Sequence, residues 1–185
     1  YAIAEELQKN GFDTTLISGP TNLKPPEGVK IFNVISADEM YEKTIKNLPV
    51  DVAIFTAAVG DFRAKQINVD KIKKEKFEKM ELIKTKDILG YTSKHNKLRP
   101  KLVIGFAAET SNLDENSKNK LVEKNCDWIV SNDVSNKEIG FDSEYNEVKI
   151  FRRNKPNIEN ISITTKEMIA KKLVEKISNE LKANG

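Results

Sequence analysis

Short apolar runs alternate along this chain with longer stretches in which apolar residues recur every three or four positions. The runs are typical of strands buried in a parallel sheet, and the stretches are typical of helices with one buried face. This pattern predicts strands at 14–18, 29–35, 52–56, 80–83, 102–108 and 128–131, with a late hairpin over 146–151 and 158–163. Helices are predicted at 1–10, 36–48 and 87–93, after 112 and after 164.

Local signals mark the ends of several of these helices. Gly11 follows the first helix, where a residue in the left-handed conformation commonly ends a helix. The segments 36–39 and 164–167 each combine Ser or Thr with Glu three residues later, which is a capping box. Asn112 is predicted to cap the helix that has Glu115 at its third position.

Alternating strands and helices predict a three-layer α/β/α domain around a mostly parallel, Rossmann-like, doubly wound sheet. The strand 52–56 is apolar throughout, so we expect it to be buried on both faces and not to lie at an edge. Small or polar residues follow three strands, at 56–58, 106–109 and 131–133. Because ligands bind at the carboxyl ends of such strands, these segments predict one shared site.

Composition excludes several classes of protein. A net charge of +3 and a pI near 8.8 are too mild to indicate nucleic-acid binding. With one Cys and one His, Cys126 has no disulfide partner and a zinc cluster is not expected. The sequence has no apolar run of the ~20 residues that a membrane helix needs. We expect a cytoplasmic protein, and since Tyr1 opens directly into a helical pattern, we also expect further sequence before it.

The segment after the strand 52–56 carries candidate chemistry. Asp61 is followed by a cluster of basic residues that includes Lys71. A carboxylate among ammonium groups suits a polyphosphate bridged by Mg²⁺, although lysine-rich stretches are more often solvated surface. Lys120 and Lys124 add two cations on one face of a helix. The chain contains neither a G-x-G-x-x-G fingerprint nor a Walker loop.

Several ordered segments resemble the phosphopantothenate-cysteine ligases of coenzyme A biosynthesis. The matching segments are Ser18-Gly19-Pro20, Ala57 to Phe62, Lys71 to Lys74, Lys84 to Ile88, Gly105 to Thr110, Asn132 to Val134, and Gly140-Phe141. The order and spacing of these matches over most of the chain make the resemblance specific. Two other functions stay open, which are a Rossmann-type NAD(P)-binding oxidoreductase domain and a noncatalytic nucleotide-binding module.

The resemblance implies roles for particular residues. Lys71 corresponds to the catalytic lysine, on a flexible lysine-rich flap, and Asp61 to an aspartate that binds nucleotide and can hold Mg²⁺ through the phosphates. The family usually has proline where this chain has Lys86. The implied nucleotide-binding residues are Phe55, Thr56, Ala57 and Asp61; Lys71; Lys86, Asp87, Ile88 and Leu89; and Phe106, Lys120 and Lys124.

The resemblance also implies the reaction and its partners. The family joins 4'-phosphopantothenate to cysteine through an acyl-cytidylate, with CTP as co-substrate, although ATP stays open for this chain. The family forms homodimers, and many bacterial members carry a flavin-dependent decarboxylase domain upstream. Residues 1–185 would form a single ligase domain that lacks the family's N-terminal strand and loop, including an active-site asparagine. We therefore expect the chain alone to be inactive.

Overall fold

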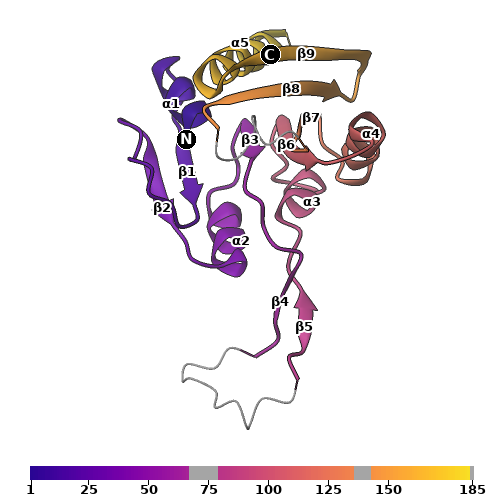
Figure 1. Cartoon of the computed structure of the whole chain (residues 1–185). Coiled ribbons are helices and arrows are strands. Elements are labelled where there is room, and N and C mark those ends of the chain that lie inside the picture. Colours follow the sequence, from indigo (N-terminus) through magenta and orange to yellow (C-terminus); the bar gives the residue numbers. More distant parts are fainter. Residues whose placement is uncertain (67–78, 136–142, 184–185) are drawn as a thin grey trace.

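A computed structural model of the chain describes residues 1–66, 79–135 and 143–183 (Figure 1). The elements along the chain are α1 (Ala2–Lys9), β1 (Thr15–Ser18), β2 (Lys30–Asn33), α2 (Ala37–Lys46), β3 (Val52–Phe55), β4 (Phe62–Ala64), β5 (Leu82–Lys84), α3 (Ile88–Ser93), β6 (Leu102–Glu109), α4 (Leu113–Glu123), β7 (Trp128–Asp133), β8 (Tyr145–Arg152), β9 (Lys155–Thr165) and α5 (Lys166–Ala183).

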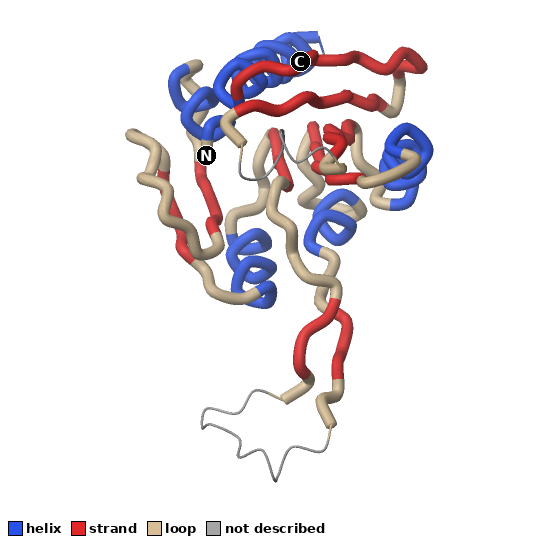
Figure 2. Tube along the Cα trace, in the orientation of Figure 1, coloured by secondary structure: helices blue, strands red, loops and turns tan. Residues whose placement is uncertain are grey.

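Five strands form the central sheet in the order β3-β6-β7-β8-β9. The pairs β3/β6 and β6/β7 are parallel, and β8 and β9 continue the sheet as the predicted antiparallel hairpin. Helices α1 and α5 pack together on one side, and α3 and α4 lie on the other (Figure 2). The predicted three-layer α/β/α class is therefore confirmed.

Alternating residues of the parallel strands supply two separate apolar clusters. Leu102 and Ile104 of β6 pack with Leu173 and Ile177 of α5, and all four are almost fully buried. Val103 and its neighbours on the opposite face pack beneath α3 and α4. Truncating a buried leucine or isoleucine to alanine typically costs ~2–5 kcal/mol, so these two clusters dominate the stability of the layers.

The prediction that the strand at 52–56 is buried inside the sheet is wrong. Within the described residues β3 lies at the edge of the central sheet, and its four residues are only half-buried. Its apolar run has a different cause, because both faces of the sheet are covered at this edge. Val52 and Ile54 pack against the cluster on the α5 side, whereas Phe55 packs against the other cluster.

Strands β1 and β2 pair in parallel as a separate two-stranded sheet. Neither strand contributes a side chain to the two apolar clusters. The helix boundaries follow the predictions in part. Gly11 has φ +82°, as a C-terminal cap requires, and the Ser36 hydroxyl accepts a hydrogen bond from Glu39 N–H at 3.2 Å.

Of two other cap predictions, the first is right in position only and the second is wrong. Asn112 occupies the cap position of α4 in a left-handed conformation, but its side chain makes no capping hydrogen bond. At α5 the cap is Thr165 and not Thr164, because the Thr165 hydroxyl accepts a hydrogen bond from Met168 N–H at 3.2 Å. Thr164 remains within β9, paired with Asn146 of β8.

Strands β4 and β5 form an antiparallel arm that projects from the body of the molecule (Figure 1). The pattern predicted a strand at 80–83, whereas the observed β5 begins two residues later and ends one residue later. The pattern did not predict β4. Arg63 at the base of the arm forms a 3.1 Å ion pair with Asp38 of α2. The segment 67–78, which joins the two strands, lies outside the described residues.

Candidate functional site

The carboxyl ends of β3, β6 and β7 lie at one edge of the central sheet. Phe55, the last residue of β3, pairs with Gly105 of β6, and Glu109 at the end of β6 pairs with Asp133 of β7. The predicted segment 56–58 follows β3, whereas 106–109 and 131–133 are the last residues of β6 and β7. The parallel strand directions bring all three segments to the same edge, as predicted.

A loop contact that the sequence does not reveal brings the segment after β3 beside the segment before α3. Thr85 N–H donates to the carbonyl oxygen of Asp61 at 2.9 Å, and the Thr85 hydroxyl donates to the carbonyl oxygen of Gly60 at 2.5 Å. These bonds place the backbone of Asp61 next to Lys86 and Asp87. Two predicted sets of nucleotide-binding residues are thereby joined.

Asp87 has two structural partners. Its Oδ1 atom accepts a hydrogen bond from Gly90 N–H at 3.0 Å and so caps α3, and its Oδ2 atom lies 2.7 Å from Nζ of Lys124. Desolvation alone would raise the pKa of Asp87, but the hydrogen bonds from Lys124 and Gly90 hold it below its usual value. Asp87 is therefore a carboxylate at neutral pH and links α3 to the end of α4.

Lys124 has the complementary environment. Its hydrogen bond to Asp87 raises the pKa of Lys124 against the opposing effect of burial, and the charge of Asp61 adds to the increase. One turn earlier on α4, Lys120 lies 3.5 Å from Glu109, whose other oxygen accepts a hydrogen bond from Asn116 at 2.9 Å.

The remaining predicted residues fall into two groups. Ile88 is buried and Leu89 packs against the apolar cluster beneath α3 and α4, so both side chains contribute to the stability of the fold. Phe106 packs with the cluster on the α5 side, which is the opposite face of the sheet from α4. The side chains of Ile88 and Phe106 are therefore directed away from a ligand at the Lys124 side. Thr56 and Ala57 follow β3 at the sheet edge and are exposed.

Gly105 explains how closely α3 approaches the sheet. A Cβ atom at this position would lie 2.8 Å from a terminal methyl of Leu89 and 2.8 Å from that of Ile129. Only glycine leaves this space to the two side chains. The close packing fixes the start of α3, and hence Asp87, relative to β6.

Lys71, the predicted catalytic residue, lies outside the described residues, as do Gly140 and Phe141. In the part of the chain that the structure describes, there is no group of three or more His, Cys, Asp or Glu side chains that could hold a metal ion. A single carboxylate such as Asp61 still suits Mg²⁺, which binds through one or two carboxylates together with substrate phosphates.

Burial raises the pKa of the Cys126 thiol to about 11, so this residue stays protonated at neutral pH.

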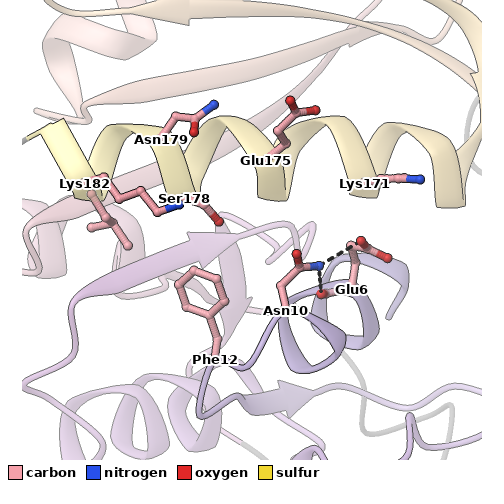
Figure 3. A pocket seen from close by; sticks show the side chains of 9 residues that line it. Glu6, Asn10, Phe12, Lys171, Glu175, Ser178, Asn179 and Lys182 are labelled. Atoms are coloured by element: carbon pink, nitrogen blue, oxygen red, sulfur yellow. Dashed lines mark hydrogen bonds between the residues drawn. The ribbon is translucent and has the colours of Figure 1, made fainter.

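A cavity of about 540 Å³ lies away from these residues, between α1 and α5 (Figure 3). It is lined by Glu6, Asn10, Phe12, Lys171, Glu175, Ser178, Asn179, Leu181 and Lys182. Of the helices that the structure describes, none is long and apolar enough to cross a membrane.

The mixed sheet and its edge of paired lysines and carboxylates define a Rossmann-like α/β protein with a candidate anion-binding site. A family model described as "DNA/pantothenate metabolism flavoprotein C-terminal domain" matches residues 1–181. The chain belongs to this family.

Named relatives agree with this assignment. The chain is 38% identical over 179 residues to the coenzyme A biosynthesis bifunctional protein CoaBC of Haemophilus influenzae, and 38% identical to that of Borreliella burgdorferi. These alignments cover 96% and 95% of the chain but 44% of each relative, so the chain spans less than half the length of these proteins.

Solved structures show the same fold. The crystal structure of the C-terminal domain of CoaBC aligns with a TM-score of 0.79 and 36% identity, covering 99% of this chain and 82% of that one. A DNA/pantothenate metabolism flavoprotein from Streptococcus pneumoniae aligns with a TM-score of 0.75 and 20% identity, covering 97% of this chain and 86% of that one. The second likeness is evidence of the fold alone.

Proposed function

We propose that this chain is the phosphopantothenate-cysteine ligase part of a coenzyme A biosynthesis protein. The observation that carries the proposal is the joining of Asp61, Asp87 and Lys124 at the carboxyl edge of the sheet, within the ordered motifs of the family. The relatives named CoaBC support it, because their similarity covers almost the whole chain. The NAD(P)-dependent oxidoreductase alternative has no glycine fingerprint to support it.

The proposed reaction has two steps. A carboxylate oxygen of 4'-phosphopantothenate attacks the α-phosphorus of CTP, and pyrophosphate leaves. The amine of cysteine then attacks the acyl carbon, loses a proton and displaces CMP. The first step converts the carboxylate, which is a poor acceptor for an amine, into an acyl group with a good leaving group.

The residues of the site suit the charge that develops in these steps. Lys120 and Lys124 would neutralise phosphate oxygens, and their ion pairs at this edge of the sheet support that role. Lys71 would act on the activated intermediate. Asp61 would hold Mg²⁺, and the bound ion would supply positive charge that offsets the negative charge of the phosphates. Asp87 would keep Lys124 ordered until phosphate binds.

We further propose a homodimer formed through the β4–β5 arm. Phe62, Met80 and Leu82 are each about 60% exposed on or beside this arm. Apolar side chains on a projecting two-stranded arm favour burial against another surface. A second copy of the chain is the proposed partner, in agreement with the family resemblance, and the proposed location is the cytoplasm.

The relatives are described as bifunctional, which supports a flavin-dependent decarboxylase domain upstream of this part in the natural protein.

Among the described strands, β1 pairs only with β2 and β3 only with β6. We propose that the upstream family segment adds a strand to these edges and supplies the active-site asparagine. On this basis the 185-residue chain alone should give no ligase turnover.

Thermal denaturation with different nucleotides tests the proposed function, since a ligand that binds only the folded protein raises its melting temperature. We expect CTP with Mg²⁺ to raise the melting temperature, and ATP with Mg²⁺ compared at equal concentration measures the nucleotide preference. Stabilisation by NADH or NADPH alone would support the oxidoreductase alternative. No response to any nucleotide would contradict the ligase proposal.

A further inference from the structure

Tyr41 lies within α2, and its ring contacts the side chain of Lys86 in the loop before α3. The Nζ atom of Lys86 lies 4.3 Å from the centroid of the Tyr41 ring. The ring of Tyr91, on α3, meets Tyr41 edge-on, with 5.1 Å between the ring centroids and 73° between their planes. Tyr91 therefore supports the ring on which the Lys86 ammonium lies.

Lys86 differs from the two lysines of α4 in the kind of partner that holds it. Lys120 and Lys124 each face a carboxylate, whereas no carboxylate of the described residues forms an ion pair with Lys86. A carboxylate cancels much of the charge of its partner. An aromatic ring attracts an ammonium group through its quadrupole and carries no net charge. The contact thus restricts Lys86 while leaving its positive charge available.

The position of this ammonium group is set from two directions. Lys86 directly precedes Asp87, which is paired with Lys124. Helix α2, which carries the ring, is fixed near the site by the 3.1 Å ion pair between Asp38 and Arg63 of β4. Thr85, whose N–H donates to the Asp61 carbonyl oxygen, directly precedes Lys86, so the backbone of Lys86 lies near that of Asp61.

We propose that Tyr41 is a positioning residue, which holds the Lys86 ammonium for contact with the phosphates of the nucleotide substrate. This inference rests on the proposed function, because it assigns the anion to that reaction. A free lysine side chain loses considerable rotamer entropy when it binds a phosphate. Contact with the Tyr41 ring already restricts the rotamers of Lys86 in the free protein. Less entropy is therefore lost when the nucleotide binds, which favours binding.

The test is a double-mutant cycle on the affinity for CTP with Mg²⁺, measured by titration calorimetry on the protein encoded by the natural reading frame. We expect Tyr41→Leu and Lys86→Met each to weaken binding about 3- to 10-fold. Tyr41→Phe keeps the ring and should stay within about twofold of the wild type. In the Lys86→Met background, Tyr41→Leu should have no further effect, because the shared contact is already absent.

Lys84→Met is the matched control, since it removes one exposed lysine two positions away. Equal weakening by Lys84→Met and Lys86→Met would mean a general loss of charge and would overturn the inference. So would unchanged affinity in Lys86→Met, or an effect of Tyr41→Leu that persists in the Lys86→Met background. Unchanged affinity in Lys86→Met overturns the inference even if Tyr41→Leu fails to fold, and a loss of more than about twofold in Tyr41→Phe would contradict the role of the ring alone.

The Lys124→Met variant separates this inference from the proposed function. If wild-type protein binds CTP and Lys124→Met weakens that binding while Lys86→Met does not, only the role of Tyr41 and Lys86 is refuted. If wild-type protein binds no CTP, the proposed function itself fails.

Discussion

The carboxylate of Asp87 and the ammonium of Lys124 lie 2.7 Å apart. Asp87 is the N-terminal cap of α3 and Lys124 is the C-terminal cap of α4, so the ion pair joins the two helices. The second oxygen of Asp87 is held by the backbone of α3, so the lysine meets a fixed carboxylate. Lys124 is consequently ordered before any ligand arrives, and part of the entropy cost of binding is avoided.

Replacing Lys124 by methionine should weaken the binding of CTP with Mg²⁺ about 10- to 100-fold, because a charge-assisted hydrogen bond to phosphate is lost. The free energy of unfolding should fall by only about 1 kcal/mol or less, since the Asp87 pair is partly exposed. Titration calorimetry and urea denaturation measure the two effects. Lys118→Met, an exposed lysine on the same helix, is the control and should change neither.

The low pKa of Asp87 predicts a dependence of stability on pH. Its folded-state pKa lies below the unfolded value, so its contribution is fully present above the unfolded pKa of about 3.9. The contribution is lost as the pH falls through the folded-state pKa. The melting temperature of wild type should therefore exceed that of Asp87→Asn at pH 6, and the difference should shrink below about pH 4. A difference that stays constant from pH 6 to pH 2 would argue against the charged pair.

Gly105→Ala should destabilise the protein by about 1–3 kcal/mol, because the added methyl group enters a buried contact between Leu89 and Ile129. Urea denaturation measures this loss. At Gly19 an added Cβ meets nothing within 4 Å, so Gly19→Ala is the control and should be nearly neutral. Equal effects of the two variants would show that α3 does not pack tightly against β6.

The proposed arm-mediated dimer predicts that Phe62→Ser combined with Leu82→Ser gives a folded monomer. These changes remove exposed apolar surface from the arm and leave the two core clusters intact. Light scattering coupled to gel filtration measures the mass at micromolar concentration. Leu23→Ser, an equally exposed leucine before β2, should leave the dimer unchanged. A double variant that stays dimeric would place the interface elsewhere.

Lys71→Ala should leave folding and CTP binding largely intact while lowering product formation about 10²- to 10³-fold, the scale of losing one electrostatic stabiliser of a transition state. The assay needs the protein of the natural reading frame and measures phosphopantothenoylcysteine by mass. Lys79→Ala is the control, because its 3.8 Å contact with Glu81 lies on the exposed arm. Activity within a few-fold of wild type would refute the assignment of Lys71.

The sequence predicts the parts of the site that depend on local order. The three segments at the carboxyl ends of parallel strands meet at one edge because strand direction is fixed by the alternation of strands and helices. Lys120 and Lys124 share a helix face because they are four residues apart. These relations need no knowledge of long-range contacts.

The remaining features depend on contacts between distant segments. Nothing in the sequence indicates that Thr85 bonds the Gly60 carbonyl, or that Asp87 meets a lysine 37 positions later. The position of β3 at a sheet edge could likewise not be predicted from the sequence. Its residues are all apolar because helices cover both faces of the sheet there, which is also the pattern of a central strand. Phe106 and Lys124 belong to neighbouring elements, yet their side chains lie on opposite faces because strand residues alternate.

The separate β1–β2 sheet has a consequence for how the molecule opens. Within the 185 residues its hydrogen bonds are independent of the central sheet, and it adds no side chain to either apolar cluster. Local unfolding costs least where few buried contacts are lost, so this unit can open while β6, α4 and α3 stay folded. Asp87, Lys120 and Lys124 of the proposed anion site lie on or beside α3 and α4, whose backbone amides should therefore be among the most protected from hydrogen exchange.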